Sequence, residues 1–548
     1  MRRALAGIAR IAALLLVTVL AATCGGGGGM SSTTSPTQPP PSGSTTPTQA
    51  TDVTTYKNDV SRTGQNVTES VLTLTNVNST TFGLLRFLST DGKVDAQPLY
   101  LSGLSLQGAT HNVVFVATEN DSVYAFDADS GAKLWQATLL GSGESPSDSV
   151  GGCSQITPQI GVTSTPVIDR AAGAHGTLFV VAMSKSASLT YYQRLHALDV
   201  TTGAELLNGP VAITATYPVM GGTMSFDPQQ YAERAALLLM QGTVYISFTS
   251  HCDDPPYSGW VMAYNEGTLA QTAVFNAAPN SGGAGPAIWM AGGGPAADSS
   301  GNVYLLTANG GFETTLDANG FPSQADYGNS FLKLTAGSLI VADYFAMYNE
   351  VAESNADQDL GSGGILLLPD LTDSSNTTRH LAVGAGKDGN LYVVSRDSMG
   401  KFSPAGNNIW QELDGALPGG IWSTPAYYNQ SLYYGPSGGA LMAFTISSAK
   451  LTAASVTSTS FTYPGTAPAV SANGSSNGIV WAHENSSPAV LHAYEASDLT
   501  HELYNSSQAA NGRDQFGAGN KYIAPAIADG KVFVGAQNGV AIFGLLPN

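Results

Sequence analysis

The stretch HCDDPPYSGWVMAYN, at residues 251–265, places a histidine, a cysteine and two aspartates directly before an apolar run. Imidazole, thiolate and carboxylate groups are common ligands of metal ions in proteins. Successive side chains of a strand point to opposite faces, so His251, Cys252 and Asp253 are not expected to share one ion. Each of these residues therefore has to be considered separately, and its role depends on the elements that position it.

Other chemistries have no motif to support them. The sequence contains no HExxH, no phosphate-binding GxxxxGK[ST], no zinc-ligand spacing, no haem-attaching CxxCH and no GxSxG in a strand-to-helix setting. The formal net charge is −19, and no cluster of Lys and Arg occurs after the N-terminus. That balance excludes nucleic acid and an anionic membrane surface as partners.

The N-terminus has the layout of an export signal, with Arg2, Arg3 and Arg10 ahead of an apolar run that ends shortly before Cys24. It resembles a bacterial lipoprotein signal in which Cys24 is lipidated, although Thr23 stands where that family prefers a smaller residue. Residues 25–55, rich in Gly, Ser, Thr and Pro, are expected to form a disordered tether. We therefore expect an exported lipoprotein at the outer membrane or cell surface, with the periplasmic face or simple secretion as alternatives.

The chain has three cysteines. If Cys24 is acylated, Cys153 and Cys252 remain as one pair in an oxidising compartment. A disulfide between them is predicted, and two separate buried thiols are the alternative.

Short alternating apolar runs with polar turns recur along the chain, and NVVFVATENDSVYAFDADSGAKLWQATL (112–139) is the most regular example. Units of several short strands cannot bury both faces alone, so they must pack around a common axis. We count eight units and predict an all-β, eight-bladed β-propeller over residues 56–548, after a signal over 1–24. The last unit lacks an outer strand, and residues 80–92 are predicted to supply it and close the ring.

The string VYAFDADSGAKLW (123–135) resembles the repeat of pyrroloquinoline quinone (PQQ) propellers, and the chain is similar to the quinoprotein alcohol dehydrogenase superfamily. The resemblance implies PQQ and Ca²⁺ above the central channel. It places Asp254 and Asn309 at the positions of metal ligands. It also places Trp289 where a tryptophan stacks on the quinone, and Lys387 at a contact to the cofactor.

The sequence also departs from that family. Asn329 stands where the family has the aspartate that accepts the proton of the alcohol, and an amide does not accept a proton at neutral pH. Asp253 and Asp326 are the substitute candidates for this base. The adjacent pair of cysteines of the family is missing. The layout DQDLG (357–361) followed by KDG (387–389) is similar to polyvinyl-alcohol dehydrogenase-like members, so these departures do not by themselves exclude activity.

Two functions follow, and the sequence leaves open whether the chain is an enzyme. The first is a tethered propeller with a degenerate quinoprotein site that binds a protein or small molecule at the channel face, without a cofactor. The alternative is a dehydrogenase of alcohols or polyols that depends on PQQ and Ca²⁺. In both cases we expect a monomer that contacts the membrane only through its lipid.

Overall fold

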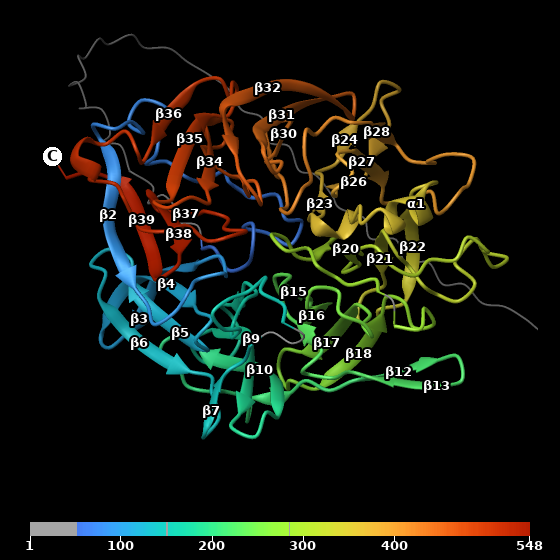
Figure 1. Ribbon diagram of the computed structural model, residues 1–548. Coiled ribbons are helices and arrows are strands. Elements are labelled where there is room, and N and C mark those ends of the chain that lie inside the picture. Colours follow the sequence, from blue (N-terminus) through green and yellow to red (C-terminus); the bar gives the residue numbers. More distant parts are fainter. Residues whose placement is uncertain (1–51, 149–151, 284, 548) are drawn as a thin grey trace, which may run out of the picture. The chain divides into compact units, whose positions relative to one another are not determined.

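The computed structural model describes residues 52–148, 152–283 and 285–547. The described residues belong to one compact unit. In this unit eight sheets of four or five strands are arranged around a central axis, as Figure 1 shows. The predicted eight-bladed all-β propeller is confirmed.

The blades follow one another in chain order, and each runs from an innermost to an outermost strand. Blade 1 consists of β3 (Leu99–Leu106), β4 (Ala109–Ala117), β5 (Ser122–Asp127) and β6 (Lys133–Thr138), and blade 2 of β8 (Val167–Asp169), β9 (Thr177–Ser186), β10 (Tyr191–Asp199) and β11 (Val211–Ala212). Blade 3 consists of β15 (Leu238–Met240), β16 (Thr243–Ser250), β17 (Trp260–Asn265) and β18 (Gln271–Asn276), and blade 4 of β19 (Ala296–Ala297), β20 (Val303–Leu306), β21 (Ser330–Leu334) and β22 (Val341–Ala346). Blade 5 consists of β23 (Leu366–Leu367), β26 (Leu381–Ala385), β27 (Leu391–Ser395) and β28 (Gln411–Leu413), and blade 6 of β29 (Ala426–Tyr428), β30 (Ser431–Tyr434), β31 (Gly439–Ser447) and β32 (Lys450–Phe461). Blade 7 consists of β33 (Ala469–Asn473), β34 (Ser476–Glu484), β35 (Val490–Glu495) and β36 (Glu502–Asn505), and blade 8 of β37 (Ala526–Ala528), β38 (Lys531–Ala536), β39 (Gly539–Leu545) and β2 (Phe82–Ser89).

Shorter elements supplement the blades. They are β1 (Gln65–Asn66), β7 (Glu144–Pro146), the hairpin β12 (Thr216–Val219) to β13 (Gly222–Ser225), β14 (Tyr231–Ala232), the pair β24 (Leu371–Thr372) and β25 (Thr378–Arg379), α1 (Glu350–Asn355), and the 3₁₀ turns η1 (Leu360–Ser362) and η2 (Ala510–Gly512). Within the described residues, no helix has the length and apolar character needed to span a membrane.

The ring closes as the sequence predicts. β2, from the N-terminal part of the chain, pairs antiparallel with β39 and becomes the outermost strand of blade 8. Phe82 of β2 is fully buried, and its ring lies 5.0 Å from that of Tyr504 and 5.4 Å from that of Trp481, both in blade 7. The first and last parts of the chain are thereby joined through a hydrophobic contact as well as a strand ladder.

The segment 53–66 lies inside the ring of innermost strands, which the sequence analysis did not foresee. Six innermost strands each donate one backbone N–H to a carbonyl of this segment, over distances of 2.8–2.9 Å; the donors are Tyr100, Ile168, Ala297, Leu367, Tyr427 and Val470. The predicted tether over residues 25–55 is therefore too long at its end, since Val53–Thr55 belong to the propeller. We call residues 53–66 the channel plug.

Three buried polar side chains fasten the channel plug. The Arg62 guanidinium donates to the carbonyl oxygens of Pro295 and Leu237 at 2.8 and 2.9 Å. Lys57 donates from its Nζ to the carbonyl of Pro468, and burial lowers its pKa to about 7. The Tyr56 hydroxyl donates to the Gly292 carbonyl at 2.6 Å. These bonds satisfy groups that would be costly to bury alone.

Candidate functional site

The repeat places one residue of each blade at the same level of the channel. The six backbone donors to the channel plug all occupy the same position of the repeat. In each repeat, the residue five places before this position begins the segment that leads into the innermost strand. We call this level the channel mouth. Its residues in blades 1 to 8 are Asp95, Thr163, Glu233, Gly292, Ser362, Trp422, Gly465 and Tyr522.

A small hollow of about 70 Å³ lies at the channel mouth. Four aromatic side chains line it, together with two carboxylates, one ammonium group and Gln155; the aromatic residues are Trp289, Trp422, Tyr463 and Tyr522. The Trp422 and Tyr463 rings meet edge to face at 5.2 Å, and the hydroxyls of Tyr463 and Tyr522 lie 2.8 Å apart. Aromatic walls of this kind suit a flat apolar ligand with polar edges.

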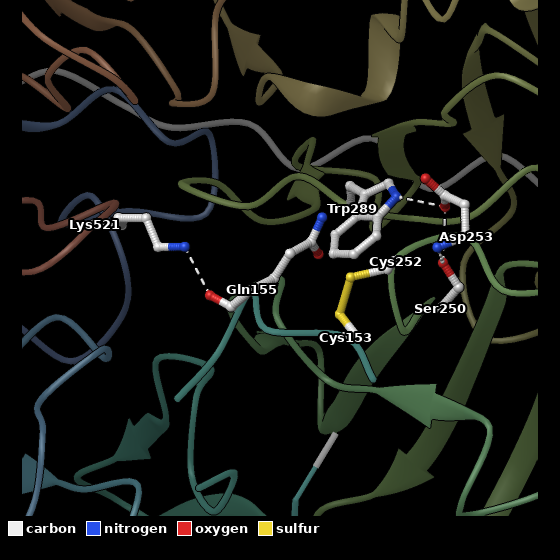
Figure 2. The surroundings of a disulfide bond; sticks show 7 residues. All are labelled: Cys153, Gln155, Ser250, Cys252, Asp253, Trp289 and Lys521. Carbon is white, nitrogen blue, oxygen red and sulfur yellow. Dashed lines mark hydrogen bonds between the residues drawn. A yellow bond between two sulfur atoms is a disulfide. The ribbon is translucent and has the colours of Figure 1, made fainter. Parts of the chain in front are cut away.

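Trp289 is held at its edge by a carboxylate. Its indole Nε1–H donates to Oδ1 of Asp253 at 3.1 Å, and the Ser250 hydroxyl donates to the same oxygen at 2.8 Å (Figure 2). Cys252 and Asp253 both have positive φ values, near 53° and 54°, so the β16–β17 loop turns sharply here. This turn directs Asp253 toward Trp289.

The structure places Asp253 and Asp254 differently from what the family resemblance implies. Asp254 is exposed and is not part of the hollow; its backbone N–H donates to the His251 carbonyl, and its own carbonyl accepts from Gln230. The sharp turn is the physical reason, because it points Asp253 toward the mouth and the next residue away from it. The predicted metal-ligand role of Asp254 therefore has no support in its position.

Lys387 lies between two carboxylates. Its Nζ is 2.6 Å from Oδ2 of Asp359, which is almost fully buried, and 2.8 Å from Oδ1 of Asp357, which is exposed. Burial opposes the ammonium form, but the two carboxylates outweigh it and raise the pKa of Lys387. Burial also raises the pKa of Asp359, against the opposing effect of Lys387. Asp357, Asp359 and Lys387 thus form an ion-pair cluster, and Asp359 and Lys387 line the hollow.

Asn309 and Asn329 both join this cluster. Asn309 donates from its backbone N–H to Asp359 and from its side-chain Nδ2 to Asp357, at 2.8 and 2.9 Å. Asn329 is fully buried; its Oδ1 accepts from the Leu360 N–H at 2.9 Å, and its Nδ2 donates to the Ser354 hydroxyl at 3.2 Å. Both the oxygen and the nitrogen of the Asn329 amide therefore form hydrogen bonds with the segment that carries Asp359.

Asp326 lies apart from the hollow. Its Oδ1 accepts from the Asn280 N–H at 2.8 Å, and burial together with the nearby Glu313 carboxylate raises its pKa to about 7. This group has a pKa suited to a base, but no contact brings it to Trp289 or Lys387. As a substitute for the missing base, Asp253 is the better placed of the two candidates.

The Cys153–Cys252 disulfide is present, which confirms the predicted pair. It joins residues 99 positions apart and links a loop after β7 to the β16–β17 loop. Figure 2 shows it beside the indole of Trp289. Cys24 lies outside the described residues.

A larger hollow of about 620 Å³ lies beside the cluster and is acidic. Gln358 and Asp388, which neighbour the ion-paired Asp359 and Lys387 in sequence, contribute to its wall. The DQDLG and KDG motifs thus meet in space, with one side toward the channel mouth and the other toward the acidic hollow.

The mouth does not fit calcium and a tricyclic quinone as the side chains are arranged. Lys387 is already ion-paired with both carboxylates next to Asn309, and the Asn329 oxygen accepts a backbone N–H. Among the described residues, no group of three or more His, Cys, Asp or Glu could hold a metal ion. The hollow of about 70 Å³ is also far below the ~300 Å³ typical of ligand pockets.

Comparisons with known proteins agree with the fold. The PQQ_2 family model, described as outer membrane protein assembly factor BamB, matches residues 119–226. No curated protein matches the chain. Among solved structures, the quinohemoprotein alcohol dehydrogenase of Comamonas testosteroni is similar with a TM-score of 0.62 and 14% identity, over 90% of this chain and 80% of that one.

Two further structures are similar in fold. The quinohemoprotein alcohol dehydrogenase ADHIIG of Pseudomonas putida HK5 has a TM-score of 0.62 and 14% identity, over 90% and 80% of the two chains. A europium-containing methanol dehydrogenase has a TM-score of 0.57 and 13% identity, over 90% of this chain and 98% of that one. The chain is a β-propeller in which residues 119–226 match a PQQ-repeat model, and its fold resembles that of the quinoprotein alcohol dehydrogenases.

Sequence reasoning missed several residues of the mouth, namely Gln155, Trp422, Tyr463 and Tyr522. A signal for two of them was available. Trp422 precedes Ser-Thr-Pro and Tyr522 precedes Ile-Ala-Pro, at the repeat position that Asp95 occupies before Ala-Gln-Pro. Aligning the units in register would have placed both at the channel. Gln155 and Tyr463 lie on connections outside this register, so no repeat signal indicates them.

Proposed function

We propose that the chain is an exported, membrane-tethered binding protein whose channel mouth is a degenerate quinoprotein site. One observation carries this proposal: Lys387 supplies the positive charge between Asp357 and Asp359, beside Asn309. A permanently bound ammonium group satisfies these carboxylates without a metal ion. The aromatic lining then serves to bind a small molecule, or a protein segment, from the channel face.

The alternative is a PQQ- and Ca²⁺-dependent dehydrogenase of alcohols or polyols. Trp289 and Asp253, in contact at the mouth, are the observation in its favour. It requires that Lys387 moves away from the two carboxylates and that the hollow enlarges when the cofactor binds. Because the side-chain arrangement does not fit the cofactor, we derive no reaction step from it.

Reconstitution separates the two functions. The protein is titrated with PQQ in the presence of Ca²⁺ by calorimetry and then assayed for dye reduction with simple alcohols. We expect neither stoichiometric binding nor dye reduction, because Lys387 holds the place of the ion. Stoichiometric binding that Trp289→Ala abolishes, together with dye reduction, would establish the dehydrogenase and reject the binding protein.

The proposed tether has its own test. Cys24 is the residue whose thiol would be acylated, so Cys24→Ser is expected to move the protein from the membrane fraction to the soluble exported fraction. Cell fractionation and labelling with a radioactive fatty acid measure this directly. Unchanged membrane association of the variant would contradict a lipid anchor at Cys24.

A further inference from the structure

A short loop lies over the channel mouth. We call residues 152–160, which lie between β7 and β8, the strap. Its Cys153 is bonded to Cys252 in blade 3, and its Gln155 carbonyl accepts from the Lys521 ammonium at 2.7 Å. The Thr157 carbonyl accepts from Lys93, just before blade 1. The Gln159 side chain also donates from its Nε2 to Oδ1 of Asn120 at 3.0 Å. The strap is therefore attached at several points around the mouth.

Apart from these contacts, the described residues of the strap make few buried contacts with the rest of the propeller. Most of its residues are exposed, and Ile160 at its end, which pairs with Ser147, is its only buried member. Contacts between surface lysines and backbone carbonyls contribute little to stability in water. A segment with few buried apolar contacts opens locally at low free-energy cost. The disulfide is thus the covalent cross-link that ties the strap to blade 3.

The strap also forms part of the wall of the hollow. Gln155 lines it, and Figure 2 shows this side chain next to the Trp289 indole. With Gln155 in place, the volume at the mouth is about 70 Å³, against the ~300 Å³ or more of typical ligand pockets. The strap therefore narrows the space beside the aromatic wall while the disulfide is closed, although Tyr463 stays half exposed.

We propose that the Cys153–Cys252 disulfide holds the strap over the channel mouth, and that its reduction opens the aromatic hollow to a flat ring ligand. The inference rests on the proposed binding function and adds its regulation. A dithiol reductant supplies two electrons and two protons. The S–S bond breaks, Cys153 and Cys252 become thiols, and the reductant becomes a cyclic disulfide.

The release is tested by amide hydrogen exchange of the full chain, with and without dithiothreitol. Reduction is expected to accelerate exchange in residues 152–160 about tenfold or more, because the cross-link no longer limits local opening. Exchange in the blade strands is expected to stay unchanged. The double variant Cys153→Ser/Cys252→Ser is the matched control: its strap exchanges fast in both conditions, and reductant has no effect on it.

Opening of the hollow is tested with the fluorescent probe 8-anilinonaphthalene-1-sulfonate, a flat aromatic anion. We expect reduced protein and the double variant to bind it at least about tenfold more tightly than oxidised protein, a difference of ~1.4 kcal/mol. Trp289→Ala in the double variant is expected to remove that gain.

The outcomes separate the two proposals. Equal strap exchange in oxidised and reduced protein overturns the inference. So does tight probe binding of equal strength in both states, although that result supports a binding function at the mouth. Faster strap exchange without any probe binding confirms release of the strap by reduction but overturns the inference of a ring ligand, and it leaves a protein segment as the occupant of the proposed binding site.

Discussion

At the scale of single residues, Lys387 is the most informative side chain of the site. An ammonium group 2.6 Å from a buried carboxylate is a strong, charge-assisted contact. Where carboxylate and amide oxygens converge and no basic residue is near, a divalent cation can balance their charge. Here the ammonium group of Lys387 has that role. The identity of this one residue therefore changes what the surrounding oxygens can bind.

Replacing Lys387 tests that reasoning. Lys387→Met leaves Asp357 and the buried Asp359 without a positively charged partner, so the variant is expected to unfold at a lower temperature than wild type. Millimolar Ca²⁺ is expected to restore part of the loss in the variant and to have no effect on wild type. Thermal unfolding with and without Ca²⁺ measures both. A variant insensitive to Ca²⁺ would show that the remaining oxygens do not form a cation site.

The raised pKa of Asp326 predicts how the stability of the protein changes with pH. Its pKa of about 7 in the folded protein lies above the unfolded value near 3.8, so the folded state binds the proton more tightly. The stability that this group contributes is full below about pH 4 and is lost as the pH rises toward 7. Asp326→Asn stays neutral, so its unfolding temperature is expected to fall by a few degrees less than that of wild type over this range.

Calorimetric scans at pH 4, 5, 6 and 7 measure the two slopes. Asp414→Asn, at an exposed position, is the control and should keep the wild-type slope. Identical slopes for wild type and Asp326→Asn would contradict a raised pKa at Asp326.

At the scale of elements, the channel plug decides what the propeller can do. It donates to or accepts from the innermost strands around the ring, so the channel is filled below the mouth and is not a conduit. The plug also explains why the hollow is shallow, because Tyr56 reaches up to the carbonyl of Gly292 at mouth level. Any ligand at the mouth therefore rests above the plug.

The plug is expected to contribute strongly to stability. Arg62→Ala removes the hydrogen bonds to the carbonyls of Pro295 and Leu237, which directly precede two innermost strands, and leaves these buried carbonyls unpaired, at a cost of about 3 kcal/mol or more. Arg170→Ala, which removes a surface ion pair with Asp52, should cost under about 1 kcal/mol. Chemical denaturation of the two variants gives the comparison. Equal, small losses would mean that the plug is only loosely attached.

At the scale of the whole propeller, stability depends on ring closure. β2 completes blade 8, and its Phe82 packs against rings of blade 7 and blade 8. Phe82→Ala is expected to cost about 3–5 kcal/mol because it leaves a cavity among large aromatic side chains. Because each blade packs against its neighbours, differential scanning calorimetry should still show one transition, at a lower temperature. A separate early transition would show that blade 8 unfolds independently.

Much of the fold was predictable from the sequence because each blade repeats the same local pattern. The strands around Val113 and Phe126 alternate or run apolar between turn residues, and the missing outer strand at the C-terminus required a partner such as 80–92. The channel plug was not predictable, because residues 53–66 have no strand periodicity and are ordered only by carbonyl and amide groups of the finished ring.

The site was predictable only in part. The sequence by itself determined that Trp289, Lys387 and Asn309 occur on loops at one end of the propeller, and that Cys153 and Cys252 are available as a pair. The tertiary structure decided which neighbours they have. A single left-handed turn selects Asp253 over Asp254, and Lys387 reaches two carboxylates across loops of different length. Such contacts depend on loop geometry and on side-chain direction, which a linear pattern of residue types does not specify.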